Sequence, residues 1–152
     1  MSDRPILELE RFLPYRLSVL SNRLSNAIAR AYETRFQLSV TEWRVIAVLG
    51  RFRGLSANEV AERTAMDKVA VSRAVARLLE SGRLQRDLHE NDRRRSVLEL
   101  SEAGYAIYES VAPIALSYEQ ALLEALEPDE RETLLKLLDK LAAKADDAER
   151  VL

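Results

Sequence analysis

Two capping boxes in the middle of the chain constrain its fold more than any other feature of the sequence. They are Ser39-Val40-Thr41-Glu42 and Ser56-Ala57-Asn58-Glu59. In such a box the serine side chain accepts a backbone N–H of the first turn, and the glutamate accepts the backbone N–H of the serine. Each box therefore marks the start of a helix. The sequence predicts one helix from residue 40 to a stop near Gly54, and a short second helix over 57–64.

A third helix is predicted to follow at once, over residues 68–81. Asp67 is a favourable N-cap, and Gly82 is a favourable residue just beyond the end. Helical periodicity places one group of apolar residues on a face that should be buried: Val71, Ala74, Val75, Leu78 and Leu79. The opposite face carries small or basic residues: Val69, Ser72, Arg73, Ala76 and Arg77. The one acid on that face, Glu80, falls in the last turn, so the first half of the face suits a groove walled by phosphates.

Two short alternating segments after this helix predict a β-hairpin. They span residues 84–89 and 96–100, and four leucines supply their apolar face: Leu84, Leu88, Leu98 and Leu100. Between them lies the segment Glu90-Asn91-Asp92-Arg93-Arg94-Arg95, which is rich in turn-forming and charged residues. Three short helices followed by a hairpin predict a mainly α fold, a winged helix-turn-helix with a two-stranded wing.

The charges are distributed unevenly along the chain. The net charge is −2, yet residues 63–95 carry 9 Lys and Arg against 5 Asp and Glu, a net charge of +4. Residues 1–62 carry 9 against 7, and residues 96–152 carry 5 against 13. A protein that coats nucleic acid without selectivity is expected to be basic throughout. The concentration of positive charge in one block favours a contact aimed at a particular site.

Helices are also predicted on both sides of this central region. Residues 6–36 form one long amphipathic pattern, interrupted early by Pro14, which lies in the first turn of the main helix with a short helical piece before it. Ser101 is expected to cap another helix after the hairpin, and Pro113 should kink or break that helix. Pro128 marks the first turn of a last helix, which is rich in leucine.

Apolar stripes of this kind need a surface to pack against. For the first helix, that surface is a partner subunit, the C-terminal helices of the same chain, or both. We therefore expect three regions: an N-terminal dimerisation helix over 1–36, a winged helix-turn-helix DNA-binding domain over 37–101, and C-terminal dimerisation helices over 102–152.

The composition argues against enzymatic, metal-binding and membrane functions. The chain has no cysteine and a single histidine, His89, so neither thiol chemistry nor a metal site is expected. It has no glycine-rich phosphate loop and no coherent pair of carboxylates, so we expect neither an enzyme nor a cofactor. Charged residues interrupt the leucines of the N-terminal segment, unlike a signal peptide or a membrane span. A cytoplasmic protein is the expectation.

The order and spacing of these parts resemble the multiple antibiotic resistance regulator (MarR) family of bacterial winged-helix transcription factors. The most specific match is Asp92-Arg93-Arg94, which resembles the family's D-x-R wing tip. Residues 98–104, Leu-Glu-Leu-Ser-Glu-Ala-Gly, resemble the L-x-L-[ST]-x-x-G that follows it. The third helix from Val71 and the segment 38–49 are similar to the family's as well. The resemblance covers nearly the full length of the chain.

This resemblance implies a sequence-specific transcriptional regulator that binds DNA as a homodimer. It implies a palindromic operator with one recognition helix in each half-site, and often a small phenolic or aromatic effector between the dimerisation and DNA-binding regions. The lack of cysteine departs from the family's peroxide-sensing branch, so thiol oxidation is not the expected signal. The alternative is a winged helix that serves as a protein-interaction or architectural module, without sequence-specific DNA binding.

In the predicted recognition helix, Arg73 is the strongest candidate for a base contact, because bidentate arginine–guanine pairing is the commonest specific contact. The alternative for Arg73 is a solvated surface arginine. Lys68 and Ser72 lie near the helix start, where side chains and backbone N–H groups meet phosphates. Arg77 fits either a phosphate contact or an ion pair with Glu80, three residues further on.

At the wing, Arg94 is expected to enter a minor groove, where a narrow A·T-rich tract has an enhanced negative potential. Arg93 and Arg95 are candidate phosphate contacts, and a charged turn is the alternative for both. Asp92 is expected to brace an arginine or the backbone of the turn, which agrees with the pattern of the resembled family.

Several other side chains have two interpretations each. Trp43 either lines an effector pocket or packs in the core beside Leu38, as part of the hydrophobic staple of the first capping box. Four more residues either border a pocket between helices or pack against neighbouring helices: Tyr15, Arg16, Tyr105 and Tyr108. The sequence therefore names no effector-binding residue.

Overall fold

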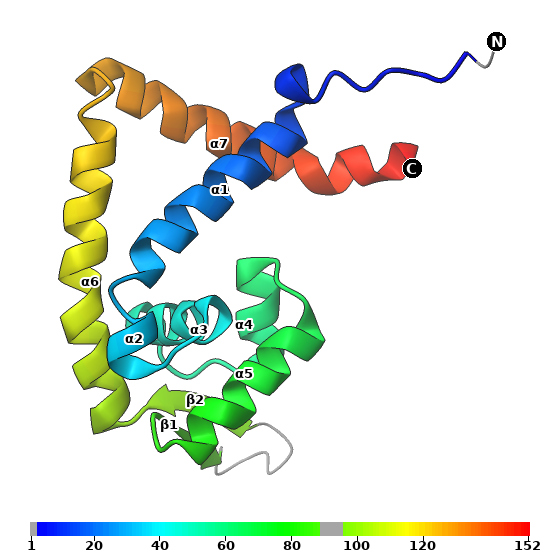
Figure 1. The fold of residues 1–152 in the computed structure, drawn as a ribbon. Coiled ribbons are helices and arrows are strands. Elements are labelled where there is room, and N and C mark those ends of the chain that lie inside the picture. The colour runs from blue at the N-terminus through cyan, green and yellow to red at the C-terminus, as the bar shows by residue number, and fades with distance from the viewer. Residues whose placement is uncertain (1–2, 89–95) are drawn as a thin grey trace. The chain divides into compact units, whose positions relative to one another are not determined.

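Helices dominate the computed structural model, which describes residues 3–88 and 96–152 (Figure 1). The N-terminal part contains a 3-10 helix (Leu9–Arg11), α1 (Leu13–Ala29) and α2 (Glu33–Phe36). The central part contains α3 (Val40–Arg51), α4 (Ala57–Thr64), α5 (Lys68–Glu80) and the antiparallel strands β1 (Leu84–Leu88) and β2 (Ser96–Leu100). The C-terminal part contains α6 (Glu102–Leu123), α7 (Pro128–Ala148) and a 3-10 helix (Glu149–Val151). The predicted mainly α, winged helix-turn-helix fold is confirmed.

The chain divides into two units, Met1–Ile114 and Ala115–Leu152. The division falls within α6, one residue past Pro113, where the sequence predicts a kink or a break. The predicted break is wrong, because α6 is continuous through the proline. Proline removes one helical hydrogen bond and costs about 3 kcal/mol in a helix interior. The turns before it are held in the core by Ile107 and Val111, which are 4% and 0% exposed.

Both predicted capping boxes are present. The Ser39 Oγ accepts the Glu42 N–H at 3.1 Å, and the Glu42 carboxylate accepts the Ser39 N–H at 3.3 Å. The second box repeats this arrangement between Ser56 and Glu59, at 3.2 and 3.3 Å. The predicted bounds of α4 are confirmed, and the left-handed Gly54 (φ 73°) follows the end of α3 as expected.

The N-terminal region contains the predicted short helical piece before Pro14, the 3-10 helix Leu9–Arg11, but its main helix ends earlier than the predicted residue 36. Pro14 does lie in the first turn of α1, as expected, but a turn over residues 30–32 separates α1 from α2. This turn brings Tyr32 into the core, where it is 1% exposed and its ring stacks on Trp43 with centroids 5.5 Å apart. Burial of a large aromatic ring outweighs the loss of a few helical hydrogen bonds. Helical periodicity alone does not show such a long-range contact.

The recognition-helix and hairpin predictions are confirmed with small changes in the bounds. The Asp67 carboxylate caps α5 by accepting the Ala70 N–H at 2.9 Å, and Gly82 (φ 75°) follows its end. The two strands pair with Leu100 opposite Leu84 and Leu98 opposite Arg86, so both predicted apolar residues of β2 lie opposite residues of β1. One further pairing was not predicted from the sequence: the Leu98 N–H donates to the Leu55 carbonyl at 2.8 Å. This bridge attaches the hairpin to the segment between α3 and α4.

The core of the first unit is shared by α3, α4, α5, the hairpin and the first half of α6. Its fully buried large side chains come from all of these elements and from the turn after α1: Tyr32, Val45, Ile46, Leu49, Val60, Val71, Val75, Leu78, Leu98 and Val111. The approach of α6 to α3 is close at Gly50, where an added Cβ would lie 2.5 Å from ring atoms of Tyr108. Gly50 therefore allows the Tyr108 ring to lie directly against α3.

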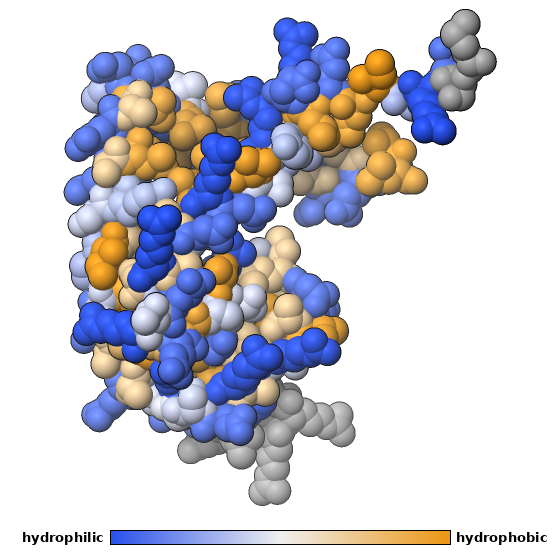
Figure 2. Space-filling model, viewed as in Figure 1, coloured by the Kyte–Doolittle hydropathy of each residue, from blue (hydrophilic) through white to orange (hydrophobic). Residues whose placement is uncertain are grey.

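In contrast, α1 and α7 keep apolar side chains on their surfaces, as Figure 2 shows for both helices. None of the residues of α7 is buried, although its exposed face carries Leu134, Leu135, Leu137, Leu138 and Leu141. The exposed apolar residues of α1 are Leu13, Tyr15, Leu17 and Leu20. Within residues 3–88 and 96–152, no helix has both the length and the apolar character that crossing a membrane requires.

Candidate nucleic-acid interface

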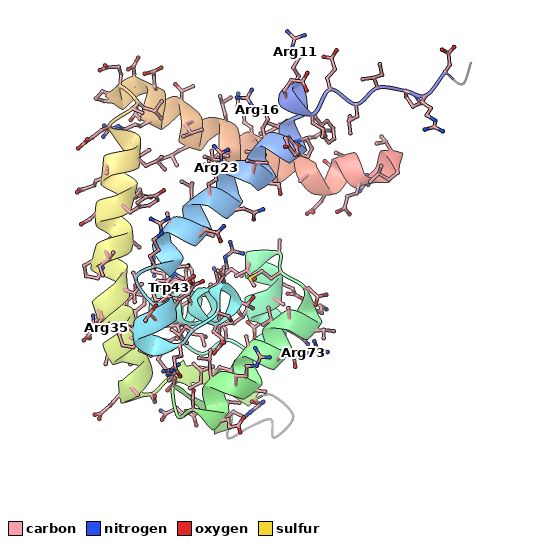
Figure 3. All side chains as sticks on the ribbon, viewed as in Figure 1. Arg11, Arg16, Arg23, Arg35, Trp43 and Arg73 are labelled. Carbon is pink, nitrogen blue, oxygen red and sulfur yellow. The ribbon has the colours of Figure 1, made fainter. Side chains whose placement is uncertain are left out.

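The exposed face of α5 is the centre of the candidate site. Its polar side chains Lys68, Ser72, Arg73 and Arg77 are all exposed, and Arg73 extends from the helix (Figure 3). The opposite face is held in the core by four side chains that are at most 2% exposed: Val71, Ala74, Val75 and Leu78. This division confirms the two faces predicted from periodicity, and it fixes the direction in which the basic side chains point.

The cations of α5 have no carboxylate partner among the residues that the structure describes. The ion pairs found there join Arg11 to Glu8 and Arg150 to Asp147. The alternative pairing of Arg77 with Glu80 is not formed. The first turn of α5 contains no acid, although the carboxylate of the N-cap residue Asp67 accepts the Ala70 N–H at 2.9 Å. The face is therefore suited to an anionic partner.

Two other cations of the basic block have structural roles. The guanidinium of Arg63 lies 4.0 Å from the centroid of the Phe52 ring, a cation–π contact that joins α4 to the end of α3. The Arg83 Nη2 donates to the Phe36 carbonyl at 2.7 Å, at the end of α2. The positive charge available to a partner within the described block is therefore concentrated on α5 and on the strand residue Arg86.

Arg86 is a wing residue that the sequence analysis misses. It lies opposite Leu98 in the hairpin register, yet it is exposed, and its Nη1 donates to the Ser96 Oγ at 2.8 Å. Strand alternation places it at an apolar position between Leu84 and Leu88, which conceals it from a search for a polar face. Its charge at such a position is the signal that could have identified it.

The predicted wing-tip residues lie outside the described ranges 3–88 and 96–152: His89, Asp92, Arg93, Arg94 and Arg95. The base of the wing is described and is firmly attached. The Ser101 Oγ donates to the Gly82 carbonyl at 2.6 Å, and the Ser101 N–H donates to the Arg83 carbonyl at 3.1 Å. The Ser101 Oγ also accepts the Gly104 N–H at 3.2 Å, which confirms the predicted cap of α6. These bonds fix the turn between α5 and β1 to the start of α6.

A second feature of the first unit is a cavity of about 130 Å³ beside the α1–α2 turn. It is lined by Ser25, Ile28, Tyr32, Val40, Trp43 and Arg44. Trp43 packs against the core, which is one of its two interpretations, and it also forms a wall of the cavity. Its ring stacks between Tyr32 and Tyr108, with the Tyr108 centroid 6.5 Å away.

The polar groups of the cavity are a guanidinium, a hydroxyl and a phenol. Arg44 is half-buried, and its Nη2 donates to the Ser25 Oγ at 2.8 Å. Burial, together with the nearby Glu33, raises the pKa of Tyr32 to about 12, and Arg44 offsets part of this rise. The Tyr32 hydroxyl therefore remains protonated at neutral pH. Ser25 and Arg44 are not predictable as neighbours from the sequence, because the two are brought together only by the turn after α1.

The other aromatic candidates pack against helices or remain at the surface. Tyr105 and Tyr108 pack against the core, whereas Tyr15 is 44% exposed on α1. Among the residues that the structure describes, no three His, Cys, Asp or Glu side chains gather in a way that would hold a metal ion.

Comparison with known proteins places the chain among transcriptional regulators. Residues 36–95 match the MarR family sequence model. The chain is 29% identical over 96 residues to the HTH-type transcriptional regulator BilQ of Clostridium symbiosum, which covers 63% of this chain and 67% of that protein. Its fold is similar to that of BpsR of Bordetella bronchiseptica, whose DNA binding is regulated by 6-hydroxynicotinic acid (TM-score 0.76, 23% identity, 91% and 98% of the two chains).

The crystal structure of a MarR/EmrR family transcriptional regulator from Acinetobacter sp. ADP1 is similar over nearly the whole of both chains. The TM-score is 0.85 and the sequence identity is 33%, over 93% of this chain and 99% of the Acinetobacter chain. The matched proteins are transcriptional regulators rather than enzymes. Identity at this level over this length, together with the winged helix-turn-helix described above, shows that the chain belongs to the MarR family of transcriptional regulators.

Proposed function

We propose that this regulator is a homodimer that recognises a palindromic operator and is released from it by a small aromatic acid. The observation that carries the DNA-binding part is the exposed face of α5, whose cations have no carboxylate partner among the described residues. In winged helices of this type the recognition helix enters the major groove, and two half-sites lie about one helical turn of DNA apart.

The α5 residues have distinct roles in this proposal. Arg73 contacts a guanine, because its guanidinium matches the two acceptors that guanine presents in the major groove. Lys68, Ser72 and Arg77 contact phosphates on either side of the groove. At the wing, Arg94 enters the minor groove, Arg93 and Arg95 contact phosphates, and Asp92 braces the turn.

The dimeric part of the proposal is supported by the exposed apolar faces of α1 and α7. A leucine-rich helix without a buried residue is stable in water only if another surface covers it. We assign residues 1–36 and 102–152 to dimerisation and residues 37–101 to DNA binding. A twofold dimer presents two copies of α5, which is the arrangement that a palindrome matches.

Replacing Arg73 by alanine tests the proposed base contact. Each half-site is expected to lose about 1–3 kcal/mol of discrimination at one G·C pair, because a bidentate pair is removed. The measurement is fluorescence anisotropy with an operator obtained by in vitro selection, and with versions in which each G·C pair is changed. At the contacted position, the variant should bind the operator with the original G·C pair and the operator with the changed pair with equal affinity.

Arg150→Ala is the matched control, since it removes another exposed arginine, one that is paired with Asp147 at 3.9 Å. It should bind the selected operator like the parent. If Arg73→Ala discriminates as well as the parent, the assignment of Arg73 is wrong. If the parent selects no sequence and its binding does not depend on salt, the interaction-module alternative is favoured instead.

The effector part of the proposal rests on the cavity beside Trp43. Its volume of about 130 Å³ is close to the ~150 Å³ of an apolar cavity that holds benzene. The Trp43 and Tyr32 rings provide stacking surfaces, and the half-buried Arg44 forms no ion pair with a carboxylate among the described residues. A single aromatic ring with a carboxylate matches these walls and this charge. The regulation of BpsR by 6-hydroxynicotinic acid is a precedent within this fold.

Replacing Arg44 by methionine is expected to weaken the binding of aromatic acids about 10- to 100-fold, because a charge-assisted hydrogen bond contributes roughly 1.5–3 kcal/mol. Trp43 is the only tryptophan of the chain, so its fluorescence reports ligand binding directly. A panel of benzoic and nicotinic acids would be titrated against the parent and the variant. DNA affinity without acid should remain within about twofold of the parent, since Arg44 takes no part in DNA binding.

Arg30→Met is the control, because Arg30 is exposed and does not line the cavity. It should bind the acids like the parent. If the acids quench the Trp43 fluorescence of the parent and of Arg44→Met at the same concentrations, the acid does not bind beside Arg44 in this cavity.

A further inference from the structure

Val69 is the exception among the apolar residues of the winged helix-turn-helix. It is 56% exposed. Among the residues that the structure describes, it is the only exposed large hydrophobic side chain between Leu20 and Ile114. All the others belong to the N-terminal segment and α1, or to the chain from Ile114 onward. The fold therefore buries, fully or partly, every other large apolar side chain described in this region and leaves this one in water.

The position of Val69 does not follow from helix stability. It lies in the first turn of α5, beside the capping residue Asp67, and it takes no part in the core. A β-branched residue has a lower helix propensity than alanine, lysine or glutamate, so a solvent-exposed position of α5 gains nothing from valine.

The neighbours of Val69 on the helix surface show what it would meet. Residues three and four positions apart lie side by side on a helix, so Val69 lies next to Ser72 and Arg73. Both are exposed, and both belong to the face that the proposed function directs into the major groove. A hydroxyl and a guanidinium recognise hydrogen-bonding groups there, whereas an isopropyl group cannot.

Among the base edges in the major groove, the one pronounced apolar group is the C5 methyl of thymine, which only A·T pairs present. We infer that Val69 is a specificity-determining residue that packs against a thymine methyl group in each half-site. This inference rests on the proposed DNA-binding function and adds a second base contact to that of Arg73. The methyl groups of Val69 and thymine exclude water from each other, while Arg73 satisfies the acceptors of a neighbouring base.

The spacing along α5 restricts where this thymine lies. Four residues of α-helix span about 6 Å. Bases of one DNA strand are stacked about 3.4 Å apart. The thymine is therefore expected within about two base pairs of the guanine that Arg73 contacts.

Deoxyuridine provides the test, because it differs from thymidine only by the missing methyl group. The operator would be selected from random DNA with the full-length parent. Each thymine would then be replaced by deoxyuridine in both half-sites, and affinities would be measured by anisotropy. At one thymine position the affinity of the parent should fall about fourfold per half-site, or roughly 15-fold for the whole operator. This is the fall expected when each half-site loses one buried methyl-sized group.

Val69→Ala should lose most of the preference for the thymine operator over the deoxyuridine operator at that position, because the two γ-methyl groups that extend beyond Cβ are gone. Arg77→Ala is the control: it should weaken binding to both operators by the same factor and retain the preference for thymine. The circular dichroism spectrum and melting temperature of Val69→Ala should match those of the parent, since the side chain takes no part in the core.

The outcomes separate this inference from the proposed function. If the parent selects no DNA sequence, the proposed function fails. If the parent selects an operator but no thymine responds to deoxyuridine, or if Val69→Ala retains the full response, the contact of Val69 is disproved while sequence-specific binding stands.

Discussion

Replacing Gly104 by alanine is expected to lower the free energy of unfolding by about 3 kcal/mol, the upper end of the usual cost of overpacking. In an ordinary helix the same change would stabilise the protein by about 1 kcal/mol, because alanine has the higher helix propensity. The opposite sign is expected here because an added Cβ would overlap the carbonyl oxygen of Arg83. That oxygen belongs to the backbone and already accepts the Ser101 N–H at 3.1 Å, so it cannot move away without losing this bond.

Urea denaturation followed by far-ultraviolet circular dichroism measures the change. Gly54→Ala is the matched control, because an added Cβ at Gly54 meets nothing within 4 Å. It should cost only about 1–2 kcal/mol, the price of placing a side chain at a left-handed φ of 73°. A Gly104→Ala protein as stable as the parent would show that the turn before β1 and the start of α6 do not pack as described.

Gly104 also shows where sequence reasoning reaches its limit. The residue is recognisable as the end of the segment that resembles the family's L-x-L-[ST]-x-x-G. The reason for a glycine at this point is a contact with a turn some twenty residues earlier in the chain, at Arg83. Such a contact has no local signature, so the physical reason becomes visible only in three dimensions.

Helix starts were predictable for the opposite reason. The caps at Ser39, Ser56 and Asp67 are hydrogen bonds that close within three residues, so the sequence contains all of their partners. The two faces of α5 were predictable because periodicity depends only on helix geometry.

The cavity beside Trp43 was not predictable, because it depends on the turn that ends α1. Periodicity continues through residues 30–32, and no glycine or proline marks a break there. The break follows from burial of Tyr32 against Trp43, a tertiary contact that overrides local preference. Only after this turn is formed do Ser25 and Arg44 meet.

Leu138→Glu is expected to convert the proposed dimer into a monomer. Leu138 lies near the middle of the apolar stripe of α7 and is 41% exposed in the single chain. In a dimer the substitution occurs twice, and burying a leucine contributes about 1.5–3 kcal/mol. A carboxylate at a covered apolar position adds a desolvation penalty. The dimerisation constant should therefore fall by at least about 1000-fold, the equivalent of roughly 4 kcal/mol.

Sedimentation equilibrium distinguishes one chain of 17.3 kDa from two. Ala143→Glu is the matched control, because Ala143 is exposed and lies about 140° around α7 from Leu138. It introduces the same charge on the polar side and should remain dimeric. Circular dichroism would show whether the Leu138→Glu monomer stays folded, since many homodimers have no stable monomer.

The same variant separates dimerisation from DNA contact. A folded Leu138→Glu monomer retains α5 and its cations, so it should bind an isolated half-site with the affinity of a single parent winged helix. It should lose most of the additional affinity that the parent gains on the full palindrome, because two half-sites are no longer linked within one molecule. A parent that is monomeric, or a Leu138→Glu protein that remains dimeric, would show that α7 does not form the interface. The apolar stripe of α7 would then need another partner, since its leucines are too exposed to be explained by the fold of one chain.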